Sequence, residues 1–118
     1  PYPGGPKNRA DYGCSVQGLG VANYGGFDKA YLAGDWCTGI VWAVAWDKAT
    51  SKWQLQNLLQ TTLQFTSGTV DDDGTVLATN CYCFYTDDKG PVANPVGALW
   101  RVVTADKVPA GSEVAKTK

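Results

Sequence analysis

The side chains in this sequence that could take part in chemistry are four cysteines and several aspartates, because the chain contains no histidine. Without histidine, the chain alone cannot assemble a Ser–His–Asp or Cys–His nucleophile. It also cannot form a zinc, copper or iron site that uses imidazole ligands. The sequence therefore predicts no catalytic residue and no metal site on this chain.

The cysteines favour disulfide bonding over redox catalysis, since four of them occur in 118 residues and none forms a Cys-x-x-Cys pair. This usage indicates an oxidising compartment. Cys81 and Cys83 are two residues apart on an expected strand, and therefore about 6.6 Å apart, near the upper limit for a disulfide. We expect buried thiols at these two positions, or a bond to another chain, rather than a bridge between them. A metal site there would need further soft ligands.

The aspartates cluster at Asp71, Asp72 and Asp73, directly before Gly74, and again at 87–88. Their spacing does not match an EF-hand loop, which needs ligands at alternate positions and a distal glutamate. Nothing in the sequence marks one carboxyl as desolvated enough to be the acid of a glycosidase. A solvated hairpin turn explains the first cluster better.

Length, charge and hydropathy restrict the class of protein further. The 118 residues fit one ordinary domain, and a 44% apolar share is sufficient for a core. Ten basic and eleven acidic residues give a formal net charge of −1, which argues against binding nucleic acid or anionic lipid. The longest apolar run, residues 40–46, is far too short to span a membrane. We expect no nucleic-acid partner and no direct membrane insertion.

Short strands separated by turns are the elements expected to position these residues. Aromatic and β-branched side chains predict a strand over residues 38–46, after a shorter one over residues 29–36. An Asp-Gly turn joins residues 66–70 to residues 75–85 as a hairpin. Residues 96–104 form a further strand.

The remaining segments are less regular. Residues 53–65 fit a helical stripe of leucines and a strand alternation about equally well. Residues 1–12 have the proline and glycine content of a lead-in or linker, and residues 105–118 form a small, charged tail. The strand-forming region therefore covers residues 13–104.

Four segments within that region carry motifs in a recognisable order: GCSVQG at 13–18, YLAGDWCTGIVW at 31–42, DDGTVL at 72–77 and GALWRVV at 97–103. Together they resemble the glucose/sorbosone dehydrogenase type of β-propeller, the family of the PQQ-dependent sugar dehydrogenases. The Gly-Asp-Trp-Cys-Thr-Gly turn is the most specific of these matches.

The resemblance implies an all-β fold: the last blade, with a flanking strand, of a β-propeller built from antiparallel strands with little or no helix. It makes residues 53–60 the second strand of the blade and residues 63–70 its third. It also brings Cys14 and Cys37 together as a disulfide. The residues that it assigns to structural motif positions are Gly34, Asp35, Trp36, Gly39, Trp42, Asp73 and Gly74.

The resemblance also shapes the expected function, mainly through departures from the family pattern. Sugar-oxidising members have a catalytic histidine in an earlier blade, and basic residues that hold the PQQ carboxylates just before the strand matched here by Ile40. This chain has Trp36, Cys37 and Thr38 at those positions, and related propellers often have arginine in place of Ile40. We expect no cofactor on this chain alone, with PQQ and calcium possible in the complete assembly.

A blade takes about 40 to 50 residues and a propeller needs at least about four blades, so the chain is too short to close a propeller. We expect an extracytoplasmic (periplasmic or secreted) segment or subunit, not catalytic by itself, that completes a larger assembly with other protein chains. Two alternatives remain open. The chain could be a piece of an active PQQ-dependent sugar dehydrogenase, or a free-standing secreted, lectin-like module that uses aromatic side chains such as Tyr2, Tyr12 and Tyr24.

Overall fold

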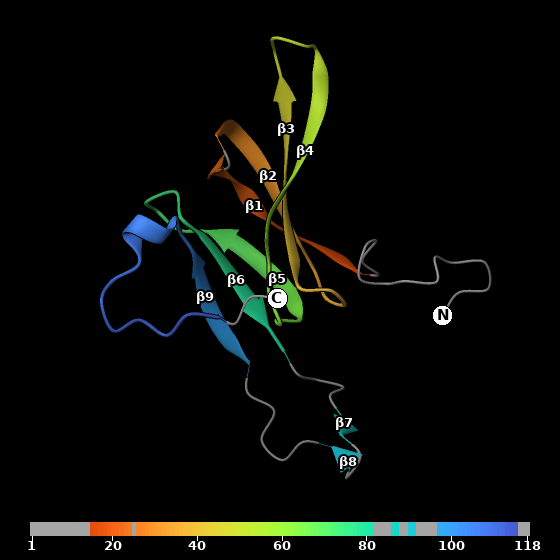
Figure 1. The fold of residues 1–118 in the computed structure, drawn as a ribbon, viewed down its shortest axis with the longest axis vertical. Helices are drawn as coiled ribbons and strands as arrows, with labels where there is room; N and C mark the ends of the chain where they lie inside the picture. The colour runs from red at the N-terminus through yellow and green to blue at the C-terminus, as the bar shows by residue number, and fades with distance from the viewer. Residues whose placement is uncertain (1–14, 25, 82–85, 88–89, 92–96, 116–118) are drawn as a thin grey trace, which may run out of the picture.

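Antiparallel β-strands dominate the computed structural model, which describes residues 15–24, 26–81, 86–87, 90–91 and 97–115 (Figure 1). The first sheet has the strands in chain order: β1 (Val16–Tyr24), β2 (Phe27–Asp35), β3 (Ile40–Asp47) and β4 (Lys52–Gln60). The second sheet has the order β5 (Phe65–Val70), β6 (Val76–Asn80) and β9 (Ala98–Val102). A two-stranded hairpin of β7 (Thr86–Asp87) and β8 (Gly90–Pro91) and a 3₁₀ turn, η1 (Ala105–Lys107), complete the elements.

The all-β, antiparallel prediction is thereby confirmed. Two hairpins follow their local signals. Gly74 takes a positive φ of 83° in the β5–β6 turn, where the Asp71 amide donates to the Thr75 carbonyl over 2.8 Å. In the β3–β4 turn, Asp47 accepts from the Ala49 amide over 2.9 Å. No helix among the described residues is long and apolar enough to cross a membrane.

The strand order corrects the expectation for residues 53–70. β4 is the fourth strand of the first sheet, not the second strand of a blade, and β5 opens a new sheet. The chain leaves the first sheet at Thr61, which is buried and whose amide donates to the Gly39 carbonyl over 2.8 Å. Residues 52–60 form a strand because β4 pairs with β3 from Gln60 to Lys52, with one register shift that leaves Leu58 unpaired.

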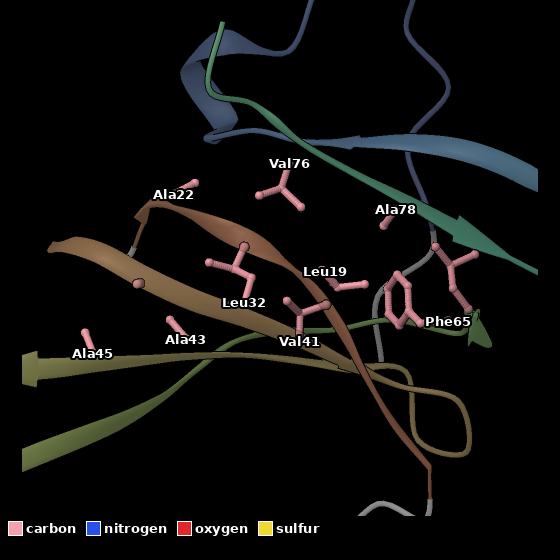
Figure 2. Packing of buried hydrophobic residues seen from close by; sticks show 11 residues of the cluster. Leu19, Ala22, Leu32, Val41, Ala43, Ala45, Phe65, Val76 and Ala78 are labelled. Atoms are coloured by element: carbon pink, nitrogen blue, oxygen red, sulfur yellow. The ribbon is translucent and has the colours of Figure 1, made fainter. Parts of the chain in front are cut away.

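The two sheets meet along their first strands, β1 and β5 (Figure 1). Figure 2 shows the side chains that fill the space between them, with Leu19, Leu32 and Val41 facing Phe65 and Val76. All five side chains are at most 5% exposed. A Cβ atom at Gly34 would lie 2.8 Å from the Phe65 ring, so this position needs glycine to admit the ring. Packing between sheets therefore depends on small residues opposite large ones.

Cys37 and Cys81 are both disulfide-bonded. For Cys81 this corrects the expectation of a buried thiol or a bond to another chain. The expectation assumed strand geometry, but β6 ends at Asn80, one residue before Cys81. Cys14 and Cys83 lie outside the described residues, so the Cys14–Cys37 pairing stays a prediction.

Candidate functional site

The Gly-Asp-Trp-Cys-Thr-Gly motif forms a buried turn between β2 and β3 whose centre is Asp35. One carboxylate oxygen of Asp35 accepts from the Ser15 amide over 2.8 Å. The other accepts from the amide and the hydroxyl of Thr38, over 2.7 and 2.8 Å. Gly39 closes the turn with a φ of 70°, and a Cβ there would lie 2.2 Å from the Thr61 carbonyl oxygen. Asp35 is wholly buried and acts as an acceptor for the start of β1 and for the turn.

This turn does not fit a PQQ site. Thr38 uses both of its donors on Asp35, Cys37 is disulfide-bonded, and Ile40 is only 4% exposed. Residues 35–40 contain neither lysine nor arginine. A quinone with three carboxylates requires cationic partners, which residues 35–40 do not supply. The contacts described for Asp35, Thr38 and Gly39 hold the turn itself.

The Asp73–Gly74 turn lines an open depression of about 410 Å³ together with the end of β1 and Lys107. Asp73 is exposed, and Arg101 lies 2.8 Å from its carboxylate. The Thr75 backbone amide, the Thr75 hydroxyl and Arg101, in that order, lower the pKa of Asp73. Asp73 thus stays ionised at neutral pH and is unsuited to act as a general acid.

Tyr24, one of the aromatic residues considered for sugar stacking, lies at the edge of the same depression. Its hydroxyl donates to the Val102 carbonyl and accepts from the Val76 amide over 3.4 Å. Tyr24 therefore ties the first sheet to the second. Tyr2 and Tyr12 lie outside the described residues.

The most distinctive surface is one face of the first sheet, which we call the aromatic face. Direct pairing across the strands puts Val21, Tyr31, Val44 and Leu55 in one row, and Trp46 beside Trp53 in the next. Leu55 is 68% exposed, Trp53 59% and Tyr31 55%. The Trp53 ring lies edge-on to Trp46 and Tyr31, with centroids 5.5 and 6.3 Å away.

This face turns away from the second sheet. Ala30, Leu32, Ala43 and Ala45, which alternate with the aromatic-face residues along β2 and β3, are buried in the core between the sheets. Figure 1 shows the β3–β4 hairpin, which carries Trp46 and Trp53, reaching beyond the rest of the first sheet. A contiguous apolar surface of this kind marks a site of interaction.

Corresponding residues occupy paired rows in three strands of each sheet, so we describe the two sheets as copies of one three-stranded unit. Across the first sheet, Gly18 pairs with Ala33 and Ala33 with Trp42. Across the second, Gly68 pairs with Ala78 and Ala78 with Trp100. In the next row on the same face, Val21, Tyr31 and Val44 match Val70, Val76 and Val102, although β1 has one extra residue, Leu19, in its bulge between the two rows.

The residue that ends the second strand also corresponds in the two units. Asn80 stands two residues after Ala78, as Asp35 stands two residues after Ala33, and both are buried. The Asn80 carbonyl oxygen accepts from the Ala98 amide over 3.2 Å and from the Trp100 indole over 2.7 Å. Each unit thus uses a buried side-chain acceptor to connect its strands.

The two units differ in what covers them. In the second sheet, Val76 and Ala78 lie on the face that packs against the first sheet, and both are completely buried. The corresponding face of the first sheet is the aromatic face, where Tyr31 is exposed. The second sheet also ends at β9, with no counterpart of β4 among the described residues.

Comparison with known proteins adds no relative: no family model, no curated protein and no solved structure matches this chain. The resemblance to sugar dehydrogenase propellers accordingly stays a prediction. No group of three His, Cys, Asp or Glu side chains that could hold a metal ion occurs within the described ranges.

The sequence indicated a motif position for Trp42, which lies on the same side of β3 as Val44 and Trp46, but it did not indicate the aromatic face as a whole. It also missed Gly18, Gly68 and Asn80 as corresponding positions. Two signals could have revealed the repeat: Leu-Ala-Gly-Asp at 32–35 against Leu-Ala-Thr-Asn at 77–80, and Gly-Ile-Val-Trp at 39–42 against Gly-Ala-Leu-Trp at 97–100. The connections between the second and third strands differ greatly in length, which hides the match in a linear reading.

Proposed function

We propose that this chain is a non-catalytic, extracytoplasmic segment of a larger β-propeller assembly, similar in kind to the glucose/sorbosone dehydrogenases. The observation that carries the proposal is the exposed aromatic face of the first sheet, in a molecule whose second sheet buries the same face. Solvent-exposed Trp53, Tyr31 and Leu55 have a large apolar area to remove from water when a partner binds.

Two further features support this proposal. The disulfide bonds at Cys37 and Cys81 suit an oxidising compartment outside the cytoplasm. The stacked repeats, which meet along their first strands, are the arrangement expected of neighbouring blades. In this proposal the chain contributes packing and part of the rim, and any PQQ or calcium belongs to the completed assembly.

Native mass spectrometry of the protein purified from its natural source tests the proposal. We expect the mass of this chain plus at least one companion polypeptide, or a longer polypeptide that contains this sequence. A solitary 12.6 kDa monomer would contradict the proposal. Dye-linked sugar oxidation measured after adding PQQ and calcium separates an active dehydrogenase assembly from an inactive one.

A second candidate, a lectin-like module, is favoured by the Tyr31–Trp53–Trp46 ring cluster, since exposed rings can stack on sugars. A glycan array probed with the purified chain distinguishes the two functions. Saturable glycan binding that is lost in Trp53→Ala, by a chain that is monomeric in its natural source, would favour the lectin.

A further inference from the structure

Two glycines at corresponding positions of the repeat have opposite surroundings. A Cβ atom at Gly68 would lie 2.5 Å from the Cα atom of Leu19, because the bulged backbone of β1 lies directly on β5 at this point. At Gly18, the corresponding residue of the first sheet, a Cβ atom would have no neighbour within 4 Å. Gly68 is thus required by the contact between the sheets, and no contact among the described residues requires Gly18.

We infer that the aromatic face is covered by a third sheet of the same kind, whose first strand lies over Gly18 as the backbone of Leu19 lies over Gly68. This inference rests on the proposed function and names the partner and the geometry of the contact. The contact between the first and second sheets serves as the template for the contact between the third sheet and the first. In both contacts the covered face is the one that carries the corresponding glycine, Gly68 or Gly18.

The template also indicates the chemistry of the partner. The first sheet covers the second with small and aliphatic residues on its buried side, such as Leu32, Ala43 and Ala45. A third sheet with a similar side would leave room for the larger rings of Tyr31 and Trp53. We therefore expect an antiparallel sheet with alanine and leucine on its docking side.

A second copy of this chain fits the aromatic face poorly. The face of the second sheet that points away from the first mixes Leu77 and Leu99 with Thr69, Thr79 and Arg101, and the Arg101 guanidinium is ion-paired with Asp71 and Asp73 over 3.2 and 2.8 Å. Burying these charges and hydroxyls against aromatic rings would cost free energy without supplying new partners. The template also requires the core side of a first sheet, and in a second copy that side is already covered by the second sheet, so the occupant is a sheet from a polypeptide segment outside residues 15–115.

A chain in which residues 14–64 occur twice in succession supplies such a sheet. The extra copy presents the buried side of a first sheet to the aromatic face of the next copy, and residues 61–64 provide the same connection that links β4 to β5. Each copy retains Cys14 and Cys37. We expect a monomer that unfolds in one cooperative transition, at a higher urea concentration than the native chain.

Gly18→Val supplies the decisive comparison, because the duplicated chain contains Gly18 once inside the new contact and once outside it. In the second copy, where Gly18 meets the added sheet, the substitution should remove most of the rise in the urea midpoint. In the first copy, and in the native chain, it should leave the midpoint unchanged. Equal effects in both copies, or a separate early transition for the added sheet, would overturn the inference.

The oligomeric state of the native chain tests the alternative occupant. A concentration-dependent dimer in size-exclusion chromatography, abolished by Gly18→Val, would assign the aromatic face to a second copy and overturn the third sheet. The outcome for the proposed function is separate. A companion polypeptide in the native mass, combined with a duplicated chain that is insensitive to Gly18→Val, would leave the assembly intact and refute only this geometry.

Discussion

The first and second sheets pair corresponding residues across three strands, yet they differ in which of their faces is buried. The second sheet buries the face that carries Val76, Ala78 and Trp100 against its neighbour, and its opposite face mixes Thr69, Thr79 and Arg101 with Leu77 and Leu99. The first sheet buries its small residues in the same contact and leaves tryptophan, tyrosine and leucine in solvent. The second sheet, whose face is covered, therefore indicates that the first sheet lacks a neighbouring sheet over its aromatic face.

The largest effect should come from breaking the contact that the two sheets already make. Gly68→Val places side-chain atoms into the backbone of Leu19, which cannot move without distorting β1. We expect it to lower the free energy of unfolding by about 3 kcal/mol or more. Gly18→Val in the same chain is the matched control, and should change it by less than about 0.5 kcal/mol. Urea denaturation followed by circular dichroism measures both, and similar losses would refute the different roles assigned to the two glycines.

The buried acceptors at the ends of β2 and β6 provide the next comparison. Asp35→Ala leaves the amides of Ser15 and Thr38 and the Thr38 hydroxyl without this acceptor, and should cost about 3 kcal/mol. Asn80→Ala, at the corresponding place, removes a neutral acceptor of two donors and should cost about 2 kcal/mol. Asp28→Ala, at an exposed aspartate of β2, serves as the control. A larger loss of unfolding free energy in Asn80→Ala than in Asp35→Ala would contradict the corresponding roles assigned to the two positions.

These residues show how far the sequence could be read. The Asp-Gly signal at 73–74 predicted the β5–β6 hairpin because turn geometry depends on a few adjacent residues. The point at which the chain leaves the first sheet for the second was not predictable. Thr61 and Leu63 continue the alternation of polar and apolar residues in β4, although the chain changes sheets there. The aromatic face was hidden because alternation along β3 does not reveal which side meets the core.

A smaller effect tests the difference between the outer faces of the two sheets. Trp53→Ser removes two edge-on ring contacts and should lower the free energy of unfolding by about 1 kcal/mol. It should also reduce binding of a hydrophobic dye, because the aromatic face loses its central ring. Leu99→Ser changes a side chain that is 64% exposed on the outer face of the second sheet, where no aromatic ring lies in its strand pairings, and dye binding should remain as in the native chain. Equal loss of dye binding in both variants would show that the aromatic face is not a distinct apolar surface.

The smallest effect concerns the charged turn of the second sheet. Hydrogen bonds from Thr75 and the nearby Arg101 lower the pKa of Asp73. A carboxyl whose pKa is lower in the folded than in the unfolded chain stabilises the fold above about pH 4, and this contribution disappears as the pH falls through the folded-state pKa. The unfolding temperature of Asp73→Asn should therefore fall less than that of the native chain when the pH is lowered from 7 to 3. Thermal unfolding at pH 7 and at pH 3 measures the difference, and a steeper acid loss in the variant would contradict it.

The Trp46–Trp53 pair at the β3–β4 hairpin has an optical consequence. Two indoles with centroids 5.5 Å apart and planes inclined by 73° are close enough for their excited states to couple. The pair should give a split circular dichroism band, whereas Trp100 lies in the other sheet with its indole bonded to Asn80. The hairpin consequently carries its own spectroscopic reporter, whose band will change when the aromatic face is covered, without any label being attached.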